Sequence, residues 1–142
     1  MKGQEFPEKT GRLSEDTLAQ VWFSGQNDSL HKYIPEESVL SEIIKKVNKD
    51  THAELIVGTW CEDSYILAPQ MISTLEKAGI PFKLTGLDRS KKCPFNPNEC
   101  TNWDIINVPT LKLYQGETLL GVIVEYPKRS VEEDLLDLLN SN

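Results

Sequence analysis

The chain has 142 residues, a formal net charge of −7 and 39% hydrophobic residues, which is ordinary for one globular domain with its own core. The acidic balance argues against nucleic acid or an anionic membrane surface as the main partner, and no apolar run approaches the roughly 18 residues of a membrane span. We therefore expect a monomeric domain that binds neither nucleic acid nor membrane.

The N-terminal part of the chain shows one clear element. Residues 1–12 are polar and are predicted to form a flexible arm without a signal peptide, which favours the cytoplasm, or the periplasm if a signal was removed. Ser14 is a typical N-cap for a short helix that reaches Phe23. We expect residues 1–34 to form an N-terminal extension and residues 35–142 to form the main domain.

The middle of the chain alternates between helices and strands. A helix is predicted from Pro35 because apolar residues recur at helical spacing as far as Val47, and a continuously apolar strand follows over residues 53–58. The next helix spans residues 62–78, with a kink at Pro69 and a C-cap at Gly79, and leads to a second strand over residues 81–87.

The last third of the chain predicts a brief helix, a β-hairpin and a final helix. The brief helix covers residues 102–106, and the hairpin strands, residues 110–114 and 119–124, alternate around Gly116. Ser130 and Glu133 form a capping box for the final helix. This order predicts an α/β fold with a central mixed sheet, in which two parallel βα units precede the hairpin and helices cover both faces.

Cys61 is the strongest candidate for a reactive group. It directly follows the first strand and opens a helix, whose N–H groups and dipole stabilise a thiolate, the nucleophilic form of cysteine. Glu62 and Asp63 act against this effect because nearby anions disfavour another negative charge. Trp60 is expected to shield one side of the sulfur, and the Ser64 hydroxyl either donates to the thiolate or bonds to the backbone.

Cys93 and Cys100 follow the second parallel strand, so all three sulfurs are expected at one end of the sheet. The intervening turn contains Pro94 and Pro97 and could bring the two cysteines within bonding range. Three alternatives are open: a structural disulfide, a redox-active pair that resolves an adduct on Cys61, or two unpaired thiols. No metal site is expected, because the two histidines do not stand at zinc-ligand spacing from the cysteines.

The chain resembles the thioredoxin superfamily from about residue 35 to residue 140. The resemblance rests on Trp60-Cys61-Glu62-Asp63-Ser64, on Pro69 and on Asn107-Val108-Pro109-Thr110. Together with Val122-Ile123-Val124-Glu125-Tyr126-Pro127, these residues are similar to a bacterial subgroup with a WCxDS motif. The resemblance implies a thioredoxin fold with a cis Val108–Pro109 bond against the Cys61 sulfur. In such a site Trp60, Val108 and Pro109 contact an extended substrate strand.

The resemblance further implies a thiol-disulfide oxidoreductase that acts on protein or small-molecule disulfides, needs no cofactor and is served by an upstream thiol reductant. The sequence departs from the dithiol pattern at two positions: Ser64 replaces the second cysteine, and Leu55 stands where the family places a proton-transferring acid. A C-x-x-S site attacks a disulfide and stops at the mixed disulfide until another thiol resolves it. The alternative function is a binding module that captures an extended partner segment beside Pro109 without turnover.

Overall fold

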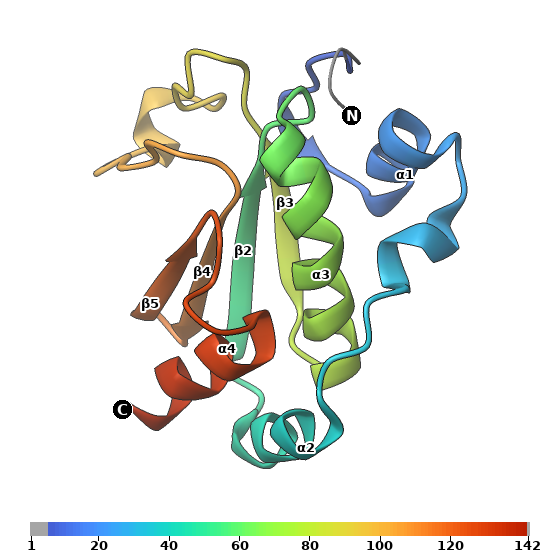
Figure 1. The fold of residues 1–142 in the computed structure, drawn as a ribbon. Helices are drawn as coiled ribbons and strands as arrows, with labels where there is room; N and C mark the ends of the chain where they lie inside the picture. Colours follow the sequence, from blue (N-terminus) through green and yellow to red (C-terminus); the bar gives the residue numbers. More distant parts are fainter. Residues whose placement is uncertain (1–5, 142) are drawn as a thin grey trace.

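The structure, a computed structural model, describes residues 6–141 as a five-stranded mixed sheet with four α-helices and two short 3₁₀ helices (Figure 1). The strand order is β1-β3-β2-β4-β5, in which β2 and β3 are parallel and the other neighbouring pairs are antiparallel. The α/β architecture and the mixed sheet are therefore confirmed.

The elements have the following bounds. The strands are β1 (Gly11–Leu13), β2 (Thr51–Val57), β3 (Phe82–Gly86), β4 (Thr110–Gln115) and β5 (Thr118–Val124). The helices are α1 (Glu15–Phe23), η1 (Asn27–His31), α2 (Glu37–Lys46), α3 (Glu62–Ala78), η2 (Pro97–Glu99) and α4 (Val131–Asn140).

The main core lies between one face of the sheet and the α-helices, and Figure 1 shows α3 and α4 in front of the sheet. Leu55 of β2 pairs in register with Leu84 of β3 and Leu111 of β4, so their side chains share this face. Buried apolar residues from α1, α2, α3 and α4 join them in one cluster. Burial of this apolar surface is the main favourable term in folding.

The expectation that helices cover both faces is wrong for the described residues. On the second face Glu54 pairs in register with Lys112 and Lys83, and Arg12 donates to Glu54 and Thr85. One end of this face carries a small second cluster built around Ile56, to which the loop between β3 and β4 contributes. The polar pattern of the strands explains the open face, because such side chains do not need a covering helix.

The segment before α1 is not a flexible arm over the residues that the structure describes. Phe6 is buried, and Thr59 fixes the backbone on either side of residue 8: its hydroxyl donates to the Pro7 carbonyl at 2.6 Å and accepts from the Lys9 N–H at 2.9 Å. β1 then pairs antiparallel with β3. The arm predicted for residues 1–5 lies outside the described residues.

Two details of the loops also differ from the prediction. Residues 102–106 are not helical, and the 3₁₀ helix η2 lies a few residues earlier. Trp103 donates its indole N–H to the Lys91 carbonyl, and Asp104 pairs with Lys112 of β4, so side-chain contacts with distant residues hold this stretch open. The helix at 62–78 is confirmed, with Pro69 inside it and Gly79 as a left-handed C-cap.

A partly buried hydrogen bond between Tyr33 and Glu132 is expected to make the stability of the fold depend on alkaline pH. Tyr33 donates its hydroxyl to Glu132 at 2.7 Å, and Glu132 is only 4% exposed. Burial, followed by this hydrogen bond, raises the pKa of Tyr33 above its ordinary value of 10.0. Above that value the unfolded chain loses the phenolic proton while the folded chain retains it. The free energy of unfolding should therefore fall as the pH rises above about 10.

Urea unfolding at a series of alkaline pH values tests this expectation. Tyr33→Phe should make the alkaline decline shallower, because Tyr33 is the tyrosine whose pKa is raised most in the folded state. Equal alkaline slopes in the wild-type protein and in Tyr33→Phe would contradict the assignment.

Candidate functional site

Cys61 is the N-cap residue of α3, immediately after the loop that leaves β2. It is the free cysteine of the described chain and is half-buried. Its thiol donates to the Val108 carbonyl at 3.8 Å, and its side chain caps no N–H group of α3. The sulfur therefore stands at the positive end of the helix dipole. Its hydrogen bond runs to Val108, in the loop before β4.

Trp60 is fixed beside Cys61 by contacts with the loop after β3. Its indole N–H donates to the Leu87 carbonyl at 2.7 Å, and a Cβ at Gly58 would come within 2.7 Å of its ring. The charged ends of Arg89 and Lys91 lie over the indole, 5.2 and 6.0 Å from its centroid. Trp60 and Cys61 thus pack against the same small apolar cluster, and shielding of the sulfur by Trp60 stays a prediction.

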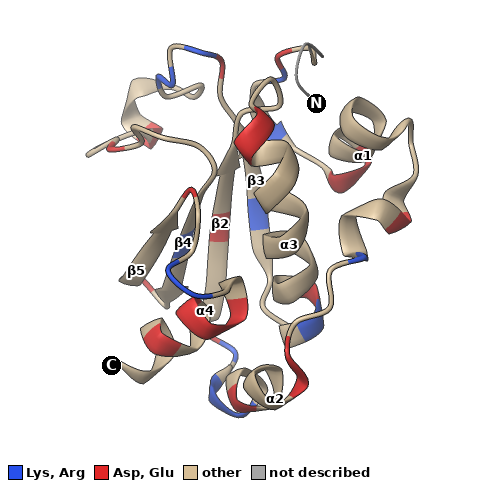
Figure 2. Ribbon diagram, viewed as in Figure 1, with Lys and Arg blue, Asp and Glu red and all other residues tan. Residues whose placement is uncertain are grey.

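The charges around the site are divided between two segments. Figure 2 shows Lys and Arg on the loop after β3, and Asp or Glu on the first turn of α3. The acidic residues of that turn are Glu62 and Asp63. The site therefore has a cationic side at Trp60 and an anionic side at the start of α3.

Val108 and Pro109 form the wall opposite the start of α3. The bond between them is cis, which confirms the prediction for this peptide. Val108 is buried and places its carbonyl at the Cys61 thiol, while the Pro109 carbonyl accepts from the Glu125 N–H at 2.8 Å. The segment after β5 is therefore tied to this wall.

Ser64 does not contact the Cys61 sulfur through a described hydrogen bond. It is fully buried, and its hydroxyl oxygen accepts from the Gly58 N–H at 3.1 Å. Of the two alternatives for this residue, the structure shows the backbone bond, which holds the loop that carries Cys61. Leu55, where the resemblance places a proton-transferring acid, is fully buried in the main core.

Ser64→Ala should lower the free energy of unfolding but leave the reactivity of Cys61 unchanged. The change leaves the buried Gly58 N–H without its acceptor, which typically costs about 1–3 kcal/mol in the free energy of unfolding. The rate at which iodoacetamide alkylates Cys61 should stay close to the wild-type rate. Ser41→Ala, on an exposed position of α2, is the matched control for the same chemical change. Slower alkylation with unchanged stability would instead place the Ser64 hydroxyl on the thiolate.

Tyr126 belongs to the rim of the site and was not singled out as a site residue from the sequence. Its hydroxyl donates to Asp63 at 3.2 Å. The negative charge of Asp63 is the largest cause that raises the pKa of Tyr126, in keeping with this hydrogen bond. The position of an aromatic residue two residues after the last strand was the available signal, but the contact joins residues 63 positions apart.

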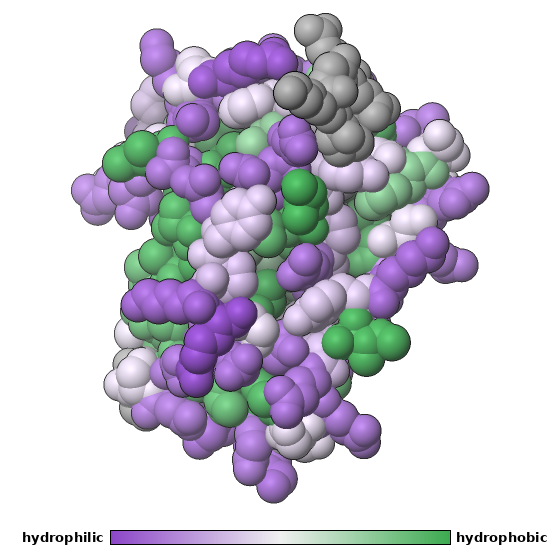
Figure 3. Space-filling view, in the orientation of Figure 1, coloured by the Kyte–Doolittle hydropathy of each residue, from purple (hydrophilic) through white to green (hydrophobic). Residues whose placement is uncertain are grey.

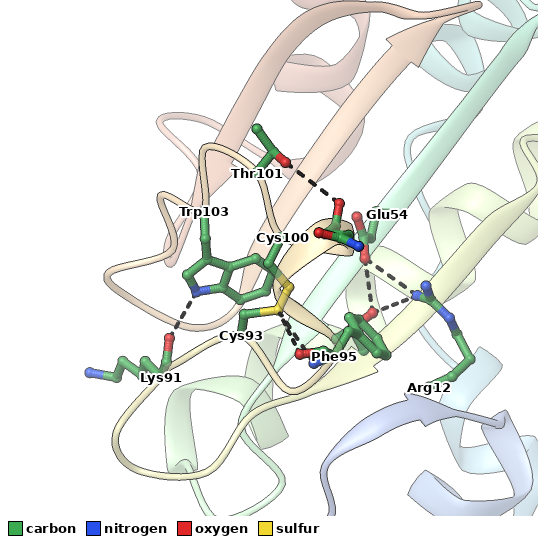
Figure 4. Close-up of a disulfide and its surroundings, with 10 residues drawn as sticks. Arg12, Glu54, Lys91, Cys93, Phe95, Cys100, Thr101 and Trp103 are labelled. Carbon is green, nitrogen blue, oxygen red and sulfur yellow. Dashed lines mark hydrogen bonds and ion pairs between the residues drawn. A yellow bond between two sulfur atoms is a disulfide. The ribbon is translucent and has the colours of Figure 1, made fainter.

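Cys93 and Cys100 form a disulfide, with 6.1 Å between their Cα atoms, so the alternative of two unpaired thiols is wrong. In Figure 4 the disulfide lies between the side chains of Trp103 and Phe95. The backbone N–H of Phe95 donates to Cys93 Sγ at 3.3 Å. Arg12 lies over the Phe95 ring, 5.0 Å from its centroid. The disulfide thus closes the loop that covers one end of the open face, and the structural and redox-active alternatives both remain.

One group of residues away from Cys61 could hold a cation. The ligand atoms of Glu15, His31 and Glu76 lie within 4.8 Å of one another, and His31 contacts Glu15 at 2.8 Å. Burial, followed by the nearby Glu76, raises the pKa of Glu15. Glu76 stands near the C-terminal end of α3, about 20 Å along the helix from Cys61. This group contains no cysteine, so it does not test the prediction that the cysteines bind no metal.

No family model and no curated protein matches the chain. Solved structures that are similar in fold include the following two. A protein of unknown function from Pseudomonas aeruginosa has a TM-score of 0.55 at 15% identity, covering 89% of this chain and 84% of its own. An HIV epitope-scaffold has a TM-score of 0.57 at 14% identity, covering 90% of this chain and 86% of its own. At these identities the likeness concerns the α/β fold alone. Within residues 6–141 no helix is both long and apolar enough to cross a membrane.

Proposed function

We propose that the chain is a thioredoxin-fold protein whose Cys61 exchanges with protein or small-molecule disulfides. The observation that carries the proposal is the position of Cys61: a free, half-buried thiol at the start of α3, facing the Val108 carbonyl beside Pro109. The WCxDS resemblance supports the same function from the sequence. The exchange needs no metal or organic cofactor, because sulfur atoms carry both the bond and the electrons.

The first step of the exchange consumes the Cys61 thiol. After the thiol loses its proton, the thiolate attacks one sulfur of the substrate disulfide, and the substrate S–S bond breaks as the new one forms. The other substrate sulfur leaves as a thiolate and takes a proton from solvent. The product is a mixed disulfide between Cys61 and one half of the substrate.

The second step requires thiols from another molecule. Cys93 and Cys100 are bonded to each other, so neither is a free resolving thiol in this state. Two thiols of an upstream reductant release the bound half of the substrate and return Cys61 to its thiol, and the reductant leaves as a disulfide. Resolution by Cys93 or Cys100 is a competing route that becomes available only after their disulfide is reduced.

A binding module is the second candidate function. Two observations favour it: Ser64 is committed to the Gly58 N–H, and Leu55 is buried where the resemblance places a proton-transferring acid. In a binding module the surface beside Pro109 holds an extended partner segment, and Cys61 does not catalyse disulfide exchange.

A single-turnover experiment tests the first function. The protein is mixed with an excess of 5,5′-dithiobis(2-nitrobenzoate), without reductant, and the release of the coloured thiolate is followed. We expect one thiolate per chain, released faster than by free cysteine at the same pH, and none from Cys61→Ser. Release no faster than from free cysteine would favour the binding module instead.

A further inference from the structure

We propose that the outer edge of β5 is a docking site for an extended segment of a partner protein, which adds to the sheet as a further strand and carries basic residues at both ends. This inference concerns β5 and not the surface beside Pro109, and it does not rest on the proposed redox function.

β5 has an unpaired edge that carries neither a charge nor a proline, and its pairing with β4 has one irregularity, between Leu113 and Tyr114. It is the last strand in the order β1-β3-β2-β4-β5, and among the described residues no strand pairs with its outer side. All seven residues of Thr118–Val124 are uncharged, and none is proline. Natural sheets usually protect such an edge with a charge, a proline or a covering element, because its free N–H and C=O groups bind another chain.

An apolar hollow lies beside this edge on the open face of the sheet. Val122 and Val124 are 42% and 43% exposed, and Ile106, from the loop before β4, is 75% exposed. These three residues line a hollow of about 210 Å³, whose lining also includes the ion pair of Asp104 and Lys112. In Figure 3 apolar surface gathers along the left side of the molecule, where Figure 1 places β5. An added strand can place alternate apolar side chains into this hollow.

A glutamate lies at each end of β5. Glu117 directly precedes β5 and Glu125 directly follows it, and neither is in an ion pair among the described residues. Asp63, at the start of α3, adds a further carboxylate near the carboxyl end of β5 through its contact with Tyr126. A partner segment with lysine or arginine at its two ends therefore complements the edge.

The same charges argue against a second copy of this chain as the occupant. Two β5 strands that pair antiparallel about Gly121 place Glu117 of one copy opposite Glu125 of the other, at both ends of the pair. Like charges directly opposite each other destabilise a strand pair. The partner is therefore a different protein whose segment alternates apolar and polar residues between basic ends.

Two synthetic peptides as long as β5 test the proposal. Both alternate valine and threonine; one has lysine at each end, and the other has glutamate. Calorimetric titration measures their affinities, and amide hydrogen exchange measures protection over residues 118–124. We expect the lysine-ended peptide to bind about tenfold more tightly, by roughly the sum of two exposed ion pairs, and to slow exchange in β5.

Charge reversal sharpens the test. Glu117→Lys combined with Glu125→Lys should reverse the preference, so that the glutamate-ended peptide binds more tightly. Asp28→Lys combined with Glu37→Lys makes the same change in net charge at exposed positions of η1 and α2, and should leave the preference as in the wild type. Equal affinities, the absence of binding by both peptides, or protection outside β5 would overturn the proposal. Self-association that protects residues 118–124 without peptide would also overturn it, because a second copy would then be the occupant.

Discussion

Cys61→Ser is expected to lower the rate of insulin reduction by dithiothreitol, measured above the uncatalysed reaction, by at least about a hundredfold. A serine hydroxyl is close in size to the thiol but does not form a bond to a disulfide sulfur. The loss of rate therefore reports the loss of the nucleophile rather than a change of shape. Turbidity of the released insulin B chain gives the rate directly.

A matched variant decides which thiol resolves the mixed disulfide. Cys93→Ser combined with Cys100→Ser should keep most of the wild-type rate, because the proposed cycle uses the thiols of the added reductant. A loss comparable to that of Cys61→Ser would contradict external resolution and assign the second step to the Cys93–Cys100 pair. Equal rates for wild type and Cys61→Ser would contradict the proposed cycle altogether.

Gly86→Ala is expected to cost about 1–3 kcal/mol of the free energy of unfolding, the typical range for overpacking at a closely packed position. A Cβ at Gly86 would lie 2.1 Å from the Lys9 carbonyl oxygen, which belongs to backbone and has little freedom to move away. The segment of residues 6–10, which Thr59 holds, should move away from the new methyl group, so its local order should fall more than that of the sheet. Urea unfolding measures the global loss, and limited trypsin digestion at Lys9 measures the local one.

Thr59→Val provides a second way to release the same segment. It removes the hydroxyl that donates to Pro7 and accepts from the Lys9 N–H, without adding volume near Gly86. Both variants should become more sensitive to trypsin at Lys9. If Gly86→Ala unfolds like the wild type and resists trypsin equally, the segment does not lie against β3 as the structure has it.

The sequence predicted the elements whose signals are local. The α3 helix was predicted from its apolar spacing, Pro69 and Gly79, and the β4–β5 hairpin from alternation around Gly116; both are confirmed. β1 was missed because it has three residues and forms through pairing with β3, a contact that no local pattern records. The helix expected at 102–106 fails for the same reason, since distant partners hold Trp103 and Asp104.

In the candidate site, too, short motifs predict some features and tertiary contacts determine the others. The location of Cys61 at a helix start and the cis bond before Pro109 are as predicted from short motifs. The bond between Ser64 and Gly58 depends on how the loop after β2 folds back onto α3, and spacing alone left two alternatives for it. Tyr126 approaches Asp63 only because the segment after β5 is tied to Pro109, which is a feature of tertiary structure.

The most direct test of Cys61 as the reactive thiol is a peptide map by mass spectrometry. The native protein is exposed to a small excess of glutathione disulfide, alkylated and digested without reductant. We expect a glutathione adduct on the peptide that contains Cys61 and an intact Cys93–Cys100 bridge. An unmodified Cys61 peptide, or an adduct on Cys93 or Cys100 instead, would contradict it.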